Sequence, residues 1–216
     1  MIESGTESEL KLRADSDAPL AELAVIERLG PARLGKGRTV EELDRYLDTG
    51  GLRLAALGWA CRLRHREGAV SLSLKGPAEH EAGAPLHLRP ELNGPATQEV
   101  DPAAWPPSTA RDRLVAMTAG EPLVERFRLA QARTEREVRW GPKRIGTLSI
   151  DRVLVLHQGV ELGTLSLVEL ELEPIAAAAG LDPEPLSRAL QRISGLRLDP
   201  LSKLEHALDM IEATSR

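Results

Sequence analysis

Alternation between charged and apolar residues restricts the fold of this chain more than any other feature of its sequence. Residues two apart on a β-strand share a face, so each alternating stretch predicts a strand with one ionic and one apolar face. The polar positions spaced in this way are Glu7, Glu9 and Lys11; Arg62 and Arg64; Ser71, Ser73 and Lys75; and Glu169, Glu171 and Glu173.

Two interpretations of these ionic faces are open. In the first, each ionic face meets water while the apolar face packs on a core, as antiparallel sheets commonly do. In the second, the sheet closes on itself, so that both signs of charge face one lumen and helices cover the apolar exterior. Runs of acids repel one another along a strand, which favours the second interpretation. Carboxylates suit Mg²⁺ or Mn²⁺, and Arg and Lys suit phosphate oxygens, so this lumen would take a polyphosphate chain carrying a divalent metal.

Periodicity and turn residues predict the order of the elements along the chain. Strands are expected over residues 7–13, 38–49, 59–66, 70–75, 86–92, 124–140, 144–157 and 160–173. Helices are expected over residues 18–29, 110–119, 184–193 and 201–213, with a turn or short helix after Gly51 and a surface loop over 93–107. Pro90 places its strand at an edge or a bulge. The pattern predicts an α+β protein built on an antiparallel sheet or barrel, as a single domain over residues 1–216.

Composition argues against several classes of protein. The chain of 216 residues has a formal net charge of -5, which argues against a nucleic-acid binder that depends on overall positive charge. No stretch approaches the roughly 18 apolar residues that span a bilayer, and no basic-then-apolar leader is present. One cysteine, Cys61, excludes an internal disulfide framework and a Cys-based zinc site. We expect a soluble cytoplasmic protein without a membrane or nucleic-acid partner.

Six short motifs then occur in order along almost the whole chain. They are Glu7-Ser8-Glu9-Leu10-Lys11, Tyr46-Leu47-Asp48-Thr49, Cys61-Arg62-Leu63-Arg64, Leu72-Ser73-Leu74-Lys75-Gly76, Val168-Glu169-Leu170-Glu171 and Ser202-Lys203. Arg133 and Asp151 stand between the fourth and fifth motifs. Taken together, the motifs resemble those of the CYTH superfamily, also called triphosphate tunnel metalloenzymes.

The resemblance implies an eight-stranded antiparallel β-barrel that forms a triphosphate tunnel, with flanking helices and with C-terminal helices over about 183–213 packing on the barrel. It implies binding of a small triphosphate or polyphosphate with Mg²⁺ or Mn²⁺. By carry-over, the metal-binding acids would be Glu7, Glu9, Asp151, Glu169 and Glu171. The phosphate-binding cations would be Lys11, Arg62, Arg64, Lys75, Arg133 and Lys203, and the catalytic set would be Glu7, Glu9, Lys11, Glu169 and Glu171.

Departures from the family pattern affect the expected substrate and partners. Gln131 stands two residues before Arg133, at a position where some relatives carry a lysine. The absence of that lysine would leave fewer positive charges in the expected tunnel. The ending after Lys203, Leu204-Glu205-His206-Ala207, resembles that of family members joined to a helical CHAD domain. Fusion to or association with such a domain, and assembly as a homodimer, therefore stay open.

Several functions fit these observations. The leading hypothesis is a metal-dependent triphosphatase acting on inorganic triphosphate or a similar compound. A class IV-type adenylate cyclase would keep the same tunnel and release cyclic nucleotide and pyrophosphate. A non-catalytic polyphosphate-binding module would bind without turnover. Non-specific nucleic-acid binding through arginines is the weakest hypothesis, and it predicts an outward basic face.

Overall fold

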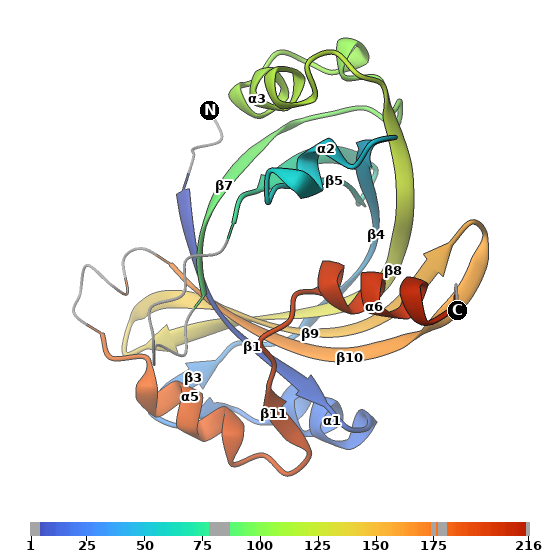
Figure 1. Cartoon of the computed structure of the whole chain (residues 1–216). Coiled ribbons are helices and arrows are strands. Elements are labelled where there is room, and N and C mark those ends of the chain that lie inside the picture. The colour runs from blue at the N-terminus through green and yellow to red at the C-terminus, as the bar shows by residue number, and fades with distance from the viewer. Residues whose placement is uncertain (1–4, 78–86, 174–175, 177–180, 215–216) are drawn as a thin grey trace.

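The computed structural model of the chain describes residues 5–77, 87–173, 176 and 181–214, with the backbone alone at residues 5–8 and 87–89 (Figure 1). The strands are β1 (Gly5–Ala14), β2 (Arg28–Leu29), β3 (Ala32–Leu34), β4 (Arg38–Thr49), β5 (Ala60–Arg66), β6 (Ala69–Lys75), β7 (His87–Pro95), β8 (Leu123–Trp140), β9 (Lys143–His157), β10 (Val160–Leu172) and β11 (Leu196–Leu198). The helices are α1 (Asp17–Val25), α2 (Arg53–Ala56), the 3-10 helix η1 (Pro102–Ala104), α3 (Thr109–Thr118), α5 (Glu184–Gln191) and α6 (Lys203–Thr214).

One strongly curved antiparallel sheet contains all of these strands (Figure 1). Its hydrogen-bonded order is β2-β3-β8-β4-β5-β6-β7-β1-β10-β9, β11 pairs with β1, and β8 also pairs with β9. Following the pairs from β8 through β4, β5, β6, β7, β1, β10 and β9 therefore leads back to β8. The α+β class and the antiparallel sheet with flanking helices are confirmed, whereas the single-domain organisation stays a prediction.

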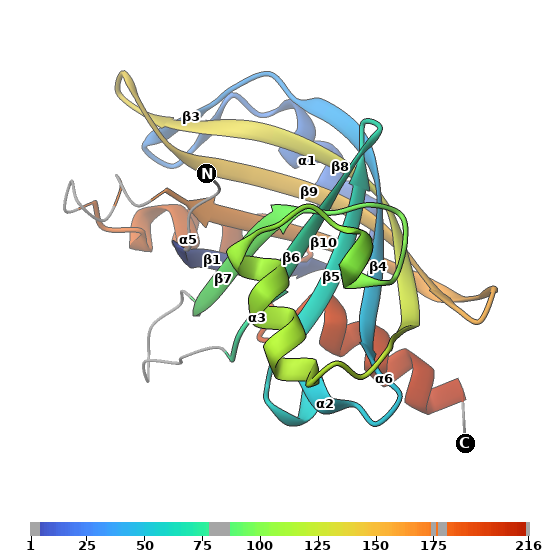
Figure 2. The same cartoon turned by 90° about the horizontal axis from the view of Figure 1, so that it is seen from above.

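Most of the helices cover the apolar face of the sheet. Leu10, Leu148 and Val168 lie fully buried beneath α1 and α5 in one core cluster. In a second cluster, Leu63 and Leu72 pack with Leu54 of α2 and Leu114 of α3, and Figure 2 shows α3 lying across β6 and β7. Burial of these leucines contributes roughly 1.5–3 kcal/mol for each side chain. This packing fixes which face of each strand is left for the charged residues.

The C-terminal helix α6 packs on the opposite face of the sheet, the face that carries the charged residues. Its Ala207 lies in a third core cluster with Tyr46, Phe127, Val155 and Leu167, and Figure 1 shows α6 within the curve of β8, β9 and β10. The general expectation that helices cover only the apolar exterior is therefore wrong for this helix. Its position brings Lys203, the first residue of α6, to the ionic face.

Two local predictions were also wrong. The helix predicted to reach Leu29 ends at Val25, because Leu29 pairs with Ala32 in a short β2–β3 hairpin. Gly30 has a φ of +55° in that turn, which favours glycine. Leu29 is buried in the strand, as it was expected to be in a helix, so its apolar spacing did not separate the two. The strand with Pro90 is not at an edge, since β7 pairs with both β1 and β6.

Among the helices that the structure describes, none is both long enough and apolar enough to cross a membrane.

Candidate functional site

A cavity of about 150 Å³ lies on the ionic face of the sheet, at the start of α6. Its charged lining residues come from strands β1, β5, β6, β7, β8 and β10 and from α6. They are the cations Lys11, Arg62, Arg64, Lys75, Arg133 and Lys203 and the acids Glu91, Glu169 and Glu171. All six predicted phosphate-binding cations therefore line one cavity.

Strand register places the predicted acids of β1 and β10 beside one another. Glu9 lies directly opposite Glu171, and Lys11 lies directly opposite Glu169. Glu9 is 3% exposed, and one of its carboxylate oxygens, Oε1, lies 2.8 Å from Nζ of Lys11. Of Glu7 the structure describes only the backbone, which lies opposite Arg89 on β7.

The fully buried Asp151 contacts two of the cations that line the cavity. Its two carboxylate oxygens each accept a hydrogen bond of 2.8 Å from Arg133, and Oδ2 accepts a third, of 2.6 Å, from Nζ of Lys203. Arg133 also donates to Glu169 at 2.6 Å. Asp151 thus holds two of the cavity's cations in place, which is a positioning role that the sequence did not predict.

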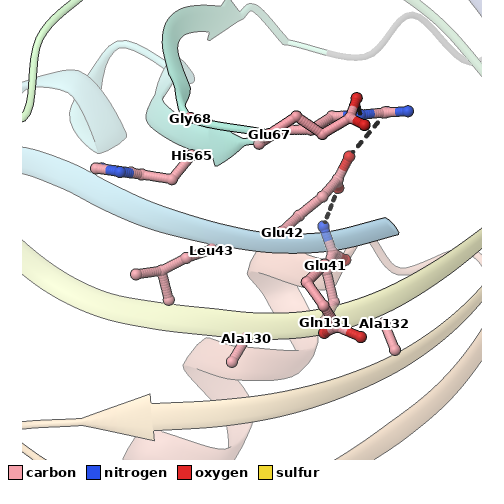
Figure 3. Close-up of a pocket in the computed structure, with 10 residues that line it drawn as sticks. Glu41, Glu42, Leu43, His65, Glu67, Gly68, Ala130, Gln131 and Ala132 are labelled. Carbon is pink, nitrogen blue, oxygen red and sulfur yellow. Dashed lines mark hydrogen bonds and ion pairs between the residues drawn. The ribbon is translucent and has the colours of Figure 1, made fainter. Parts of the chain in front are cut away.

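Glu42 and Asp44 on β4 form a second buried acidic group, and Glu42 also lines a hollow beside the β5–β6 turn. Asp44 is fully buried and accepts two hydrogen bonds of 2.7 Å from Arg64. Glu42 accepts hydrogen bonds from Arg66 at 3.0 Å and from Gln131 at 2.6 Å, and Figure 3 shows the side chains of Glu42 and Gln131 pointing toward each other. Arg64 lines the cavity and lies 3.1 Å from Glu42, which lines the hollow.

These contacts keep the buried charges ionised. Burial by itself would raise the pKa of Asp44, but Arg62 and Arg64 together hold it well below its usual range. Burial would likewise raise the pKa of Glu169, and the cations Lys203 and Arg133 outweigh it, so this pKa also lies well below the usual value. Asp44 and Glu169 therefore stay ionised at neutral pH beside these cations.

The donor types of this site suit a divalent metal. Like charges directly opposite on paired strands repel each other, and the pair Glu9 and Glu171 has this arrangement. Mg²⁺ and Mn²⁺ prefer such hard carboxylate oxygens. No group of three His, Cys, Asp or Glu residues has the geometry of a metal site among the described side chains, a set that leaves out Glu7. Residue types and register fit a metal at Glu9 and Glu171, and the five-acid ligand set stays a prediction.

Sequence reasoning missed Glu42 and Asp44, although their spacing of two with Tyr46 could have placed them on the ionic face. The sequence identified Gln131 only as a position where some relatives carry a lysine. In the structure Gln131 is buried, donates to Glu42 and accepts a hydrogen bond of 3.1 Å from Lys203. Asp48, in the tyrosine motif, has a structural role, because it accepts hydrogen bonds from the backbone of Thr49, Leu54 and Ala55 at the start of α2.

Solved structures similar to this chain share its fold at low identity. The proposed adenylyl cyclase HpAC1 from Hippeastrum, whose dominant activity is described as that of a triphosphatase, has a TM-score of 0.65 and 22% identity, over 94% of this chain and 95% of that chain. A proposed adenylate cyclase from Bacillus halodurans has a TM-score of 0.58 and 20% identity, over 94% and 98%. The PH1819 protein from Pyrococcus horikoshii has a TM-score of 0.56 and 19% identity, over 93% and 98%.

No curated protein matches the sequence. The CYTH domain profile, however, matches residues 5–208, and this range includes all of the motifs and cavity residues described above. The chain belongs to the CYTH domain family.

Proposed function

We propose that this protein is a divalent-metal-dependent triphosphatase that hydrolyses inorganic triphosphate or a similar small triphosphate. In this proposal the circuit of strand pairs acts as an eight-stranded barrel, and the cavity lies inside its tunnel. The observation that carries the proposal is the convergence of six cations, from β1, β5, β6, β8 and α6, on one small cavity that also holds acids. A triphosphate chain and its metal supply the complementary charges.

One unsatisfied donor supports a phosphate ligand. Nε of Arg62 is buried and has no hydrogen-bond partner among the described residues, and Arg62 lines the cavity. Buried donors are rarely left without an acceptor. A phosphate oxygen next to Arg62 would accept this hydrogen bond.

In this proposal some side chains bind phosphate and others bind the metal. Lys11, Arg62 and Lys75 would hold phosphate oxygens from β1, β5 and β6, while Lys203 would neutralise charge that develops on the leaving phosphate. Glu9, Glu171 and Glu7 would hold the metal, with Glu169 beside them. When bound, the metal would neutralise phosphate charge and favour deprotonation of the attacking water.

The test is phosphate release from tripolyphosphate with Mg²⁺ and with Mn²⁺. We expect metal-dependent release by the wild-type protein and its loss in the double variant Glu169→Gln/Glu171→Gln. Glu161→Gln is a matched control, because Glu161 lies on the same strand and is exposed. Equal release by the wild type and the double variant would reject the proposal.

Product analysis with ATP separates the other functions. Cyclic nucleotide with pyrophosphate would identify a cyclase. Tight binding of polyphosphate without turnover would identify a binding module.

A further inference from the structure

Four arginines lie side by side across four neighbouring strands. Arg28 on β2 pairs with Arg33 on β3, Arg33 pairs with Arg139 on β8, and Arg139 pairs with Arg144 on β9. Like charges directly opposite one another destabilise a sheet. This arrangement, here called the arginine row, therefore needs negative charge from elsewhere.

The protein itself supplies only part of that charge. Arg139 lies 3.1 Å from Glu137, and Arg144 lies 2.8 Å from Glu173. At the other end of the row, Arg33 has no carboxylate within ion-pair distance among the described residues, and Arg28 donates to the carbonyl oxygen of Pro31. The β2–β3 end of the row is thus the part whose charge is least compensated.

A hollow of about 470 Å³ adjoins this end of the row. Arg28 and Arg33 line it together with Lys36 and Arg136, and Glu27 is the one acid in its lining. Arg136 is only 4% exposed and donates to the carbonyl oxygens of Gly35 and Leu23. Burial lowers the pKa of Arg136, as expected for a buried cation without a carboxylate partner. Arg28 and Arg33 thus belong both to the arginine row and to the lining of the hollow, and the row with its adjoining hollow is called the cationic surface below.

We propose that this surface is a second anion-binding site, separate from the cavity, and that it takes a linear inorganic polyphosphate. Neighbouring strands lie about 4.8 Å apart, so the four arginines extend over about 14 Å and match an elongated ligand with repeated charges rather than a small ion. The lining of the hollow contains no aromatic side chain. Single-stranded nucleic acids depend on such side chains for base stacking, and the surface therefore favours a phosphate chain without bases.

Distance along β8 separates this surface from the cavity. Arg139 lies six residues beyond Arg133, or about 20 Å along a strand at about 3.4 Å per residue, and both residues lie on the same face of β8. A triphosphate bound at Arg133 is too short to reach Arg139, whereas a long polyphosphate spans the interval. Binding at the arginine row should therefore depend on the length of the phosphate chain. It does not require hydrolysis in the cavity.

The experiment measures binding of long-chain polyphosphate by calorimetry at several salt concentrations. The test variant is Arg28→Ala/Arg33→Ala/Lys36→Ala, and the matched control is Arg113→Ala/Arg126→Ala/Arg128→Ala, which removes three exposed cations on α3 and on the far part of β8. We expect the test variant to bind long polyphosphate about tenfold more weakly, since each exposed ionic contact is weak. The slope of log K against log salt should fall by about 2, at about 0.7 for each lost contact. Hydrolysis of tripolyphosphate should not change.

Three results would overturn the inference. Equal weakening in both triple variants would show non-specific attraction. A loss of tripolyphosphate hydrolysis in a folded test variant would make the surface part of the cavity's site. Binding of a single-stranded oligonucleotide as tightly as polyphosphate, with the same sensitivity to the variant, would identify a nucleic-acid surface instead. If the wild type fails to hydrolyse tripolyphosphate, the proposed function is wrong, but the binding experiment still tests the second site because it does not depend on catalysis.

Discussion

Replacing Asp151 with asparagine tests how the charges of the cavity are held. Asp151 is 0% exposed and accepts hydrogen bonds from Arg133 and Lys203. Removing one partner of a buried ionic pair typically costs 3–5 kcal/mol. Asparagine keeps the shape and an acceptor oxygen, so we expect a loss of about 3 kcal/mol, at the lower end of that range.

Urea unfolding of metal-free protein measures this loss. The matched control is Asp17→Asn, because Asp17 pairs with Arg152 at 3.2 Å while its side chain is 70% exposed. Exposed pairs contribute at most about 1 kcal/mol, so the control should change the free energy of unfolding by less than that.

The result also separates two roles of Asp151. A positioning role predicts that Asp151→Asn destabilises the protein equally with and without metal. Unchanged stability in metal-free protein, with a loss only when metal is added, would contradict the positioning role and make Asp151 chiefly a metal ligand.

Three further substitutions test local interactions. Ser202→Ala should destabilise the protein by about 1 kcal/mol, because Ser202 and Glu205 cap α6 reciprocally. Urea unfolding measures this loss of stability, and Ser202→Thr, which keeps the hydroxyl group, should restore most of it. Asp48→Ala should cost about 3 kcal/mol in thermal unfolding, since three backbone donors lose their acceptor at about 1 kcal/mol each; a change below 1 kcal/mol would contradict this role. Burial and the nearby Arg45 lower the pKa of His65 from 6.5, so the unfolded chain binds more protons than the folded protein below that pH. The wild type should then lose stability relative to His65→Gln as the pH falls below 6.5, and parallel pH profiles in urea unfolding would contradict the prediction.

Strand positions were predictable from the sequence because alternation reports directly on which face is buried. The strand over residues 38–49 was predicted with the bounds that the structure gives, and those over 124–140 and 160–173 differ by one residue at one end. The short strands β3 and β11 were missed. Each has three residues, which is too few for a periodic pattern to appear.

The cavity was only partly predictable, because spacing gives the face of a residue but not its partner. Arg62 and Arg64 could be placed on one face of their strand from spacing alone, whereas Lys75 joins that face through the register of β5 with β6. That Asp151 binds Arg133 and Lys203 depends on strand register and on the packing of α6, which bring residues 18 and 52 positions apart together. The arginine row likewise becomes visible only when β2, β3, β8 and β9 are placed side by side.

The most direct measurement is a crystal structure of the Glu169→Gln/Glu171→Gln variant soaked with tripolyphosphate and Mg²⁺. We expect three linked phosphates in the cavity, within hydrogen-bond distance of Lys11, Arg62 and Lys203. Tripolyphosphate bound at another surface, with this cavity filled by water at saturating ligand, would contradict it.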